Sequence, residues 1–369
     1  MRPVSEKVMA LARRRGFLWP SFEVHGKVAG LYDYGPAGTA MKRNVLEVWR
    51  RHFVVADGLL EIDTPTITPY EVFEASGHVE KFADLMGRCG SCGAYFKVEG
   101  LLGDLSGPEG ASWEETTAAL ADVPCPDCGS TEWSVSEFNL MFSTTIGPDG
   151  GRRGFLRPET AQGIFVNFAP LYRLARERMP FGVAQIGRGY RNEISPRQGP
   201  IRLREFNMAE IEFFTDPEVG EFPPAERCYD RTLRLVPAGG GERTMTAWEA
   251  YTAGIIRSQY LMYFMARTAS FLERVGIDHG RMRFRQHEPD EMAHYATDCW
   301  DAEVETSYGW IEVVGIADRS AYDLRAHMDH TGRDLTAMRR LPEPVETRVT
   351  AVVPVMQELG RRFRADART

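Results

Sequence analysis

The stretch FGVAQIGRGYRNEISPRQGPIRLREFNMAEIEFF, residues 181–214, predicts two long strands joined by a connection rich in proline and glycine at 195–200. Successive side chains of a strand point to opposite faces, so residue parity sorts them. One face of the second strand is largely apolar and can pack on a core: Ile201, Leu203, Ala209, Ile211 and Phe213. We therefore expect the rest of the chain to be organised around this hairpin.

The other face of the hairpin combines glycines, arginines, an aromatic ring and carboxylates: Gly187, Gly189, Arg191, Glu193, Arg202, Arg204, Phe206, Met208, Glu210 and Glu212. Arginine makes bidentate contacts with phosphate, an aromatic ring stacks on a base, and a carboxylate pairs with an ammonium group. Glycines let a ligand approach the backbone. The face therefore predicts a site for a nucleotide beside an amino acid. The alternative is an ordinary hairpin with a solvated charged face, and the length and matching parity favour the site.

The pattern YRNExSPRxGxxRxREFxMAExExF resembles motif 2 of the class II aminoacyl-tRNA synthetases, in the form found in glycyl-tRNA synthetases of the dimeric archaeal and eukaryotic type. The resemblance implies two catalytic residues: Arg191 would bind the α-phosphate of ATP, and Glu193 would lie near the adenine. It also implies that Arg202 reaches the nucleotide and that Phe206 stacks on the base. Glu210 would help to hold the ammonium group of glycine.

A second match to this family is RPETAQG, residues 157–163. The resemblance implies that Glu159 contacts the amino group of glycine. Alternatively, Glu159 only complements the dipole at a helix N-terminus. We expect Thr160 to cap a helix that runs to Met179, before Pro180.

A third match lies in WIEVVGIADR, residues 310–319, where an apolar strand places Asp318 and Arg319 at its end. The resemblance implies that Glu312 belongs to the ATP and Mg²⁺ site and that Arg319 belongs to the glycine pocket. Alternatively, the strand-end pair is a structural ion pair. His287 and His294, which precede this strand, lack a third ligand at metal-like spacing, so core or supporting roles are favoured.

Two CxxCG pairs predict a structural zinc site. Two residues between cysteines allow both thiolates to reach one ion, and the following glycine permits the tight turn. The ligands would be Cys89, Cys92, Cys125 and Cys128. Four protein ligands leave no open position for catalysis. Residues 103–122 are expected to form a loop or a small helix, and Cys228 and Cys299 are expected to be packed thiols.

Composition is that of a soluble globular protein of 369 residues, with 43% hydrophobic and 26% charged residues. The net charge of −8 argues against a chain that is basic throughout, so a nucleic-acid partner would need a local basic patch. Residues 1–21 contain no apolar run long enough for a signal or a membrane span. The expected location is therefore cytoplasmic, where cysteines are more often metal ligands or free thiols than disulfides.

Two helical segments flank these motifs. Helical spacing of apolar residues from Ala37 to Val55, followed by a strand from Leu59 to Pro65, resembles motif 1 and implies a homodimer. Residues 253–276 predict a helix with an apolar stripe that packs in the core: Ile256, Tyr260, Tyr263 and Phe264.

The expected fold is α+β, with an antiparallel sheet flanked by helices, a zinc-ribbon insertion and a second mixed insertion. Residues 138–145 are expected to form one strand. We expect six segments: the first part of the class II core with motif 1 (1–80), the zinc ribbon (81–135), the core with motif 2 (136–215), an insertion (216–280), a core strand and helix (281–334) and the start of a further insertion (335–369).

The resemblance extends from about Ser21 to about Asp334 and implies a glycine–tRNA ligase that uses ATP and Mg²⁺ to activate glycine and transfers it to tRNA(Gly). Motif 3 and the anticodon-binding domain of the family are absent from this sequence, so a separate chain would have to supply them, and a sheet edge should be exposed. The alternative is a non-catalytic, synthetase-like protein that binds nucleotide or RNA.

Overall fold

The computed structural model describes residues 4–102, 113–148, 150–194, 196, 199–289, 291–292, 296–339 and 355–364. His294, half of the connection predicted at 103–122 and most of segment 335–369 lie outside these ranges. The chain divides into two compact units, 1–336 and 337–369. The second contains the described helix α12 (Met356–Phe363). None of the described helices is long and apolar enough to cross a membrane.

The predicted hairpin forms from β10 (Phe181–Tyr190) and β11 (Glu205–Phe214), which pair antiparallel with Gly189 opposite Phe206. The short strand β3 (Leu60–Glu61) pairs parallel with β10. The apolar face packs on the main core as parity predicts, through Ala184, Ile186, Ala209, Ile211 and Phe213. The strands are shorter than predicted, because the connection spans 191–204. Arg191, Glu193, Arg202 and Arg204 therefore lie in this connection and not on the strands.

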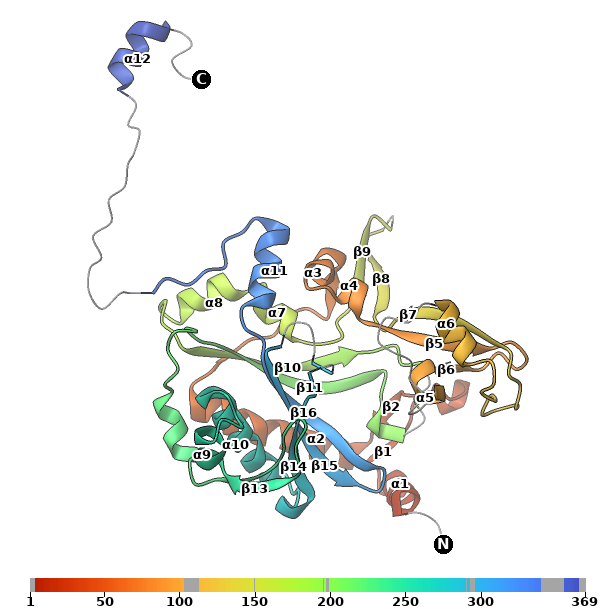
Figure 1. Cartoon of the computed structure of the whole chain (residues 1–369). Helices are drawn as coiled ribbons and strands as arrows, with labels where there is room; N and C mark the ends of the chain where they lie inside the picture. Colours follow the sequence, from red (N-terminus) through yellow and green to blue (C-terminus); the bar gives the residue numbers. More distant parts are fainter. Residues whose placement is uncertain are drawn as a thin grey trace. The chain divides into compact units, whose positions relative to one another are not determined.

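A second sheet has the strand order β13-β12-β14-β15-β16 and lies beside the hairpin (Figure 1). Its members are β12 (Thr232–Val236), β13 (Arg243–Thr246), β14 (Met282–Gln286), β15 (Asp298–Thr306) and β16 (Gly309–Asp318). β12 and β14 pair parallel, and the other neighbours pair antiparallel. Within the described part of the chain, β11 and β16 are each at the edge of their sheet.

Helices cover the apolar side of these strands. The predicted helix at 37–55 consists of α2 (Pro36–Trp49) and a π-helical segment, η2 (Arg50–Val55). The second predicted helix is α10 (Gln259–Arg274). Ser258 caps its N-terminus: the Ser258 hydroxyl accepts a hydrogen bond from the backbone N–H of Leu261 at 3.0 Å. Ile256 and Tyr263 of the predicted stripe are fully buried in the main core. Helix α9 (Ala247–Thr252) also packs on this core.

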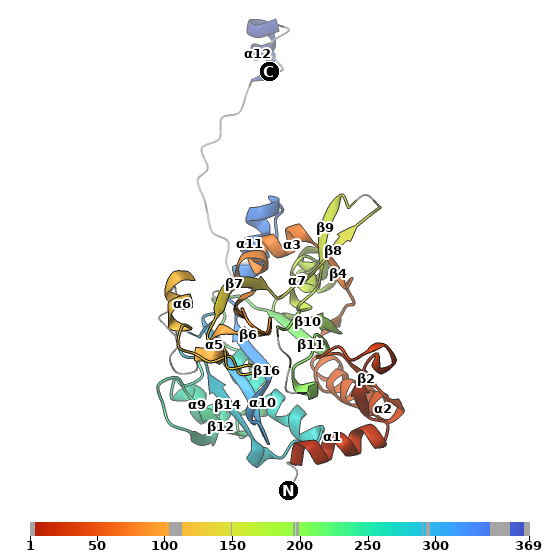
Figure 2. The ribbon, with the colours of Figure 1, turned by 90° about the vertical axis from the view of Figure 1, so that its right-hand side faces the viewer.

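The cysteine lobe, residues 83–139, projects from the hairpin in both views (Figures 1 and 2). It contains β5 (Ala83–Cys89), β6 (Tyr95–Lys97), α5 (Val98–Leu102), α6 (Trp113–Ala119) and β7 (Trp133–Asn139). The lobe has two small apolar clusters, around Phe96 and around Leu120, which do not share residues with the main core.

Further α-helices and strands form among the described residues of the first unit. They are α1 (Val4–Arg14), β1 (Leu18–Pro20), β2 (Tyr32–Tyr34), β4 (Ile67–Pro69), α3 (Tyr70–Ala75), α4 (His78–Lys81), β8 (Phe142–Ile146), β9 (Arg152–Leu156), α7 (Ala161–Phe165), α8 (Phe168–Leu174) and α11 (Tyr322–Thr331). Helix α11 lies beside α7 (Figure 1).

The single strand predicted at 138–145 is wrong, because β7 ends at Asn139 and β8 begins at Phe142. The side-chain oxygen of Asn139 accepts a hydrogen bond from the backbone N–H of Met141 at 2.9 Å, and its amide donates to the backbone of Val79 at 3.0 Å. These bonds form a local turn in place of a continuous strand.

The single helix predicted from Thr160 to Met179 is also wrong, because α7 ends at Phe165 and α8 ends at Leu174. The side-chain amide of Asn167 donates to the carbonyl of Gly163 at 2.8 Å, at the break between the two helices. Thr160 precedes α7 without a side-chain cap; its hydroxyl donates to Glu210 instead.

Candidate active site

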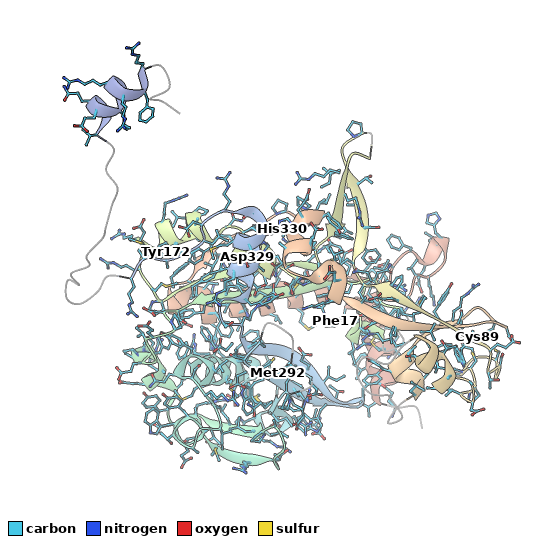
Figure 3. The ribbon with its side chains drawn as sticks, turned by 45° about the horizontal axis from the view of Figure 1, so that its top comes forward. Phe17, Cys89, Tyr172, Met292, Asp329 and His330 are labelled. Atoms are coloured by element: carbon cyan, nitrogen blue, oxygen red, sulfur yellow. The ribbon has the colours of Figure 1, made fainter. Side chains whose placement is uncertain are left out.

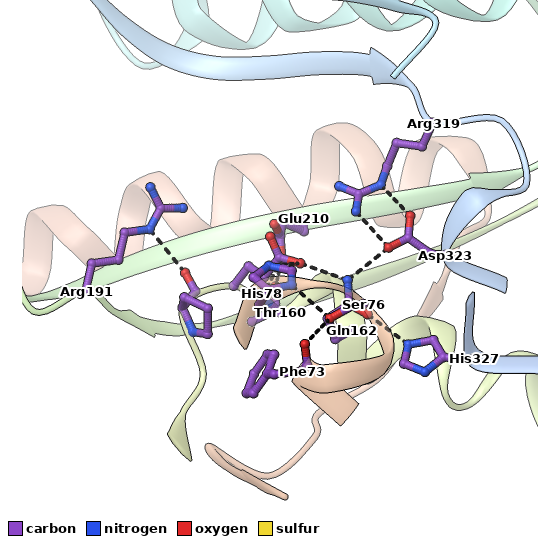
Figure 4. Close-up of polar contacts among 12 residues, drawn as sticks. Phe73, Ser76, His78, Thr160, Gln162, Arg191, Glu210, Arg319, Asp323 and His327 are labelled. Carbon is purple, nitrogen blue, oxygen red and sulfur yellow. Dashed lines mark hydrogen bonds and ion pairs between the residues drawn. The ribbon is translucent and has the colours of Figure 1, made fainter. Parts of the chain in front are cut away.

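Acidic side chains gather on the polar face of β11, at the predicted glycine pocket. Glu210 and Glu212 come from this strand, Glu159 precedes α7, and Arg319 follows β16. The Glu210 carboxylate accepts hydrogen bonds from the hydroxyl of Thr160 and from its backbone N–H, the latter at 2.6 Å. The structure thus brings together the three residues predicted to bind glycine, Glu159, Glu210 and Arg319; Figure 4 labels the last two.

Glu159 is held in its charged form by two neighbours. Its Oε1 lies 3.4 Å from His78 Nε2 and accepts a hydrogen bond of 3.0 Å from the amide of Gln162. Burial acts to raise the pKa of Glu159, but the His78 hydrogen bond and the nearby charges of His78 and Arg319 outweigh it and lower the pKa to about 2. Glu159 therefore carries a negative charge at neutral pH.

The two strand carboxylates behave differently. Burial, together with the charge of Glu159, raises the pKa of Glu210 to about 7. Burial also raises the pKa of Glu212 well above its usual range. Because three carboxyl groups share one facing guanidinium, Arg319, a bound cation would favour their ionised forms. The pocket therefore suits an ammonium group.

Arg319 is fixed by a bidentate ion pair with Asp323 of α11, with both N–O distances at 2.9 Å. Its guanidinium also lies over the ring of Phe165, 5.3 Å from the centroid. Burial acts to lower the pKa of Arg319, but the hydrogen bond to Asp323 and the charge of Glu212 raise it. Arg319 is thus a permanently charged group beside the pocket.

The predicted nucleotide end lies further along the same face. The Arg191 guanidinium lies 5.5 Å from the ring centroid of Phe82 and 5.4 Å from that of Phe206, and its Nε donates to the carbonyl of Pro158 at 3.4 Å. Arg202 forms an ion pair of 3.9 Å with the nearly buried Glu193. The structure thus brings Arg191 to Phe206 and Arg202 to Glu193.

Residue parity assigned Arg204 to the binding face, but its guanidinium instead bonds to backbone carbonyls. Its Nε and Nη2 donate to the carbonyl of Glu193 at 3.1 and 2.7 Å, and its Nη1 donates to the carbonyl of Ala29 at 2.7 Å. These bonds tie the end of the connection to the segment before β2.

The expectation that the β10 glycines make room for a ligand is wrong in this structure. A Cβ at Gly187 would lie 2.3 Å from the guanidinium of the buried Arg157, and one at Gly189 would lie 2.8 Å from the ring of Phe206. The chain's own side chains fill this space. Gly187 accommodates Arg157, which donates to the carbonyls of Arg188 and Thr64.

Glu312, the predicted Mg²⁺ residue, lies on β16 opposite Glu303. Burial and the charge of Asp301 raise the pKa of Glu312. His287 supports Asp301 with a bond of 2.8 Å, as its expected supporting role implies. The ligand atoms of His287, Asp301 and Cys299 lie within 4.8 Å of one another, so these residues could hold a metal ion. Sequence spacing did not reveal this group. Cys299 is buried, and burial raises its pKa to about 12.

The four cysteines of the CxxCG pairs meet in the lobe, where Cys89 lies away from the hairpin (Figure 3). The Sγ atoms of Cys89 and Cys128 are 3.6 Å apart, and those of Cys92 and Cys125 are 3.7 Å apart. All four Sγ atoms lie within 4.8 Å of one another. Tetrahedral zinc with Zn–S bonds of about 2.3 Å places sulfur atoms about 3.8 Å apart. The residues present therefore fit zinc.

Both turns at the cysteines have the predicted form. The N–H of Gly93 donates to the carbonyl of Cys89 at 3.0 Å, and the N–H of Gly129 donates to that of Cys125 at 2.8 Å. Both glycines have positive φ, 72° and 77°. The backbone N–H of Cys92 contributes most to lowering the pKa of Cys89, to about 6, which favours a metal-binding thiolate.

Sequence reasoning assigned no role to four residues that contact the predicted site: His78, Gln162, Asp323 and Phe82. Gln162 belongs to the RPETAQG motif, so the sequence could have indicated a role for it. The others come from separate segments, and only the fold brings them to the pocket.

No model of a protein family matches the chain. The solved structure of Giardia lamblia prolyl-tRNA synthetase in complex with prolyl-adenylate superposes on 87% of this chain and 46% of that chain, with a TM-score of 0.51 at 12% identity. This likeness shows the fold alone, and it agrees with the predicted α+β synthetase fold.

Two curated relatives are much closer in sequence. The glycine–tRNA ligase of Methanothrix thermoacetophila is 50% identical over 98% of this chain, and that of Methanothermobacter thermautotrophicus is 49% identical over 98%. The chain spans 64% and 66% of the length of these two proteins. Identity at this level over nearly the whole chain, on a synthetase-type fold, shows that the chain belongs to the glycine–tRNA ligase family.

Proposed function

We propose that this chain is the amino-acid-activating core of a glycine–tRNA ligase, which forms glycyl-adenylate from glycine and ATP and passes the glycyl group to tRNA(Gly). One structural observation carries the proposal. Phe206 and Glu210 lie on one face of β11, four residues apart, which corresponds to about 13 Å along a strand. A nucleotide with a glycyl group on its α-phosphate can span that distance.

At the nucleotide end, Arg191 would bind the α-phosphate and Phe206 would stack on the base, with Glu193 near the adenine and Arg202 reaching in from the connection. The contacts of Arg191 with two rings support this proposal, because they hold a guanidinium in place before the phosphate arrives. The glycine carboxylate attacks the α-phosphorus in line, and pyrophosphate leaves. Arg191 stabilises the charge that develops on the phosphorus oxygens.

At the amino-acid end, Glu159 and Glu210 would pair with the glycine ammonium group. Arg319 belongs to the same pocket. The excess of carboxylates there supports this proposal, because the ammonium would satisfy charges that burial otherwise disfavours. The terminal hydroxyl of the tRNA then takes the glycyl group from the adenylate.

We also propose two metal sites. Zn²⁺ would be held by Cys89, Cys92, Cys125 and Cys128 as a structural ion. Mg²⁺ would be held by Glu312, whose hard carboxylate oxygens suit it, and would supply positive charge to the ATP phosphates. Residues 81–135 and 216–280 would be insertions in the catalytic core, and 335–369 the start of another. A homodimer through the segment 37–65 completes the proposal.

The test is exchange of labelled pyrophosphate into ATP by this chain alone, with glycine, alanine or serine. We expect exchange with glycine only, and its loss in Arg191→Ala. Arg188→Ala is the matched control: Arg188 lies on the same hairpin, pairs with Glu205 at the surface and should leave exchange unchanged. No exchange by a chain that still binds ATP, either alone or after addition of a chain that carries motif 3, would overturn the proposed activity and favour a non-catalytic nucleotide- or RNA-binding protein.

A further inference from the structure

The amide of Gln162 joins two parts of the pocket that come from different segments. Its Nε2 donates to Glu159 Oε1 at 3.0 Å and to Asp323 Oδ1 at 3.0 Å. Its Oε1 accepts from His327 Nε2 at 2.9 Å. Gln162 is 1% exposed, and Asp323 and His327 are each 3% exposed. This bridge is therefore shielded from water (Figure 4).

The donor and acceptor pattern allows only one orientation of the amide. An amide has two N–H donors on its nitrogen, and here each faces one carboxylate. A flipped amide would place its oxygen against both carboxylates, which is unfavourable in a buried site. His327 Nε2 lies 2.9 Å from the amide oxygen; because both carboxylates face the amide nitrogen, this contact assigns the ring proton to Nε2.

Asp323 in turn holds Arg319 through the bidentate pair. A continuous chain of hydrogen bonds therefore runs from Glu159 through Gln162 and Asp323 to Arg319. Its two ends are an anion and a cation of one pocket, supplied by the segment before α7 and the segment after β16. A shift of Gln162 would release both ends together.

We propose that Gln162 is a positioning residue for glycine activation, which sets the Glu159 carboxylate and, through Asp323, the Arg319 guanidinium in the geometry that binds glycine. The proposal rests on the proposed function. Gln162 itself does not touch the substrate. It acts by donating one hydrogen bond to the partly buried carboxylate of Glu159 and one to the buried carboxylate of Asp323, a task that no apolar or acidic side chain of the same size performs.

The test compares Gln162→Met, which keeps the approximate volume and removes both donors, with Gln286→Met. Gln286 is the matched control, because its amide also donates to a buried carboxylate, Asp298, at 2.9 Å, but in the second sheet. Glycine and ATP are varied separately in pyrophosphate exchange. We expect Gln162→Met to raise the KM for glycine roughly tenfold or more, since each lost bond involves a charged group. The KM for ATP should stay within about twofold.

A purely structural role would give a different pattern. Both variants would then lose thermal stability, and neither would change the KM for glycine, which would overturn the proposal. Gln162→Glu separates shape from donation: it keeps the shape, offers no donor when ionised, and should raise the KM at least as much as Gln162→Met. A KM for glycine near that of the unaltered chain in Gln162→Glu would also overturn it.

A measurement that does not depend on activity distinguishes failure of this inference from failure of the proposed function. The Arg319 Nε–H resonance, identified by its loss in Arg319→Lys, should shift in Gln162→Met and not in Gln286→Met. If the unaltered chain shows no exchange, alone or with a chain that carries motif 3, the proposed function fails, and this resonance still decides whether Gln162 positions Arg319. An unmoved resonance overturns the inference.

Discussion

Burial of the Glu210 carboxylate at the proposed glycine site lowers the stability of the fold. Its pKa of about 7 in the folded chain lies above the ordinary 4.5, because burial and the charge of Glu159 disfavour the anion. The anion is therefore destabilising above pH 7, and the penalty disappears as the pH falls to about 4.5. A shift of this size corresponds to a penalty on the order of 3 kcal/mol.

Glu210→Gln should therefore stabilise the protein at pH 8 and have little effect at pH 4.5. The amide oxygen of the glutamine still accepts from Thr160, so the hydrogen bonds remain while the charge is removed. Thermal unfolding at both pH values measures the difference. Glu205→Gln, on the same strand but in an exposed ion pair with Arg188, is the control and should change little at either pH. A lower unfolding temperature for Glu210→Gln at pH 8 would contradict the assignment.

At the scale of elements, the contact between η2 and α10 depends on a neutral histidine. His52 is 3% exposed; its Nε2 bonds to the carbonyl of Arg267 at 2.9 Å and its Nδ1 accepts from Arg274 at 3.2 Å. Burial, together with the charge of Arg267, lowers the pKa of His52 to about 4. The unfolded chain therefore binds a proton that the folded chain does not between about pH 6.5 and pH 4.

This packing should weaken in acid. The contribution of neutral His52 to the free energy of unfolding is complete above pH 6.5. It is lost as the pH falls towards 4, and the loss is on the order of 3 kcal/mol. In His52→Gln, which cannot take up a proton, the free energy of unfolding in urea should fall less between pH 7 and pH 4. Equal falls in the variant and the unaltered chain would show that His52 is not the group responsible.

Elements were predictable where the determining signal is local. The hairpin, α2 and α10 follow from alternation and helical spacing, although α10 begins at Gln259 and not at Ala253, and the cysteine cluster follows from ligand spacing. The breaks at Asn139 and Asn167 were missed, because side-chain bonds to backbone groups decide them, and for Asn139 one of those groups lies in α4. The Gln162 bridge was missed for a related reason: its partners Asp323 and His327 lie on α11, far along the chain.

At the scale of the whole molecule, the cysteine lobe and the main core are stabilised by separate sets of apolar residues. The lobe's own apolar clusters are small, with Cys89 and Cys125 part of one of them. A small cluster buries too little apolar surface to order a segment of this size, so bound zinc should supply most of the lobe's stability. The main core, between the two sheets and their helices, does not include these residues.

Removal of zinc should therefore unfold the lobe alone. After chelation, we expect the amides of Gly93 and Gly129, which close the two cysteine turns, to exchange with solvent deuterium at nearly the rate of an unfolded chain. Amides of β10 and α10 should keep their protection, because the residues that bury them are not in the lobe. Cys92→Ser should reproduce the effect without a chelator, whereas Cys228→Ser, at a half-buried thiol outside the lobe, should not. Loss of protection in β10 together with the lobe would instead mean that one cooperative unit includes both, and that the cysteine site also stabilises the sheet that contains β10.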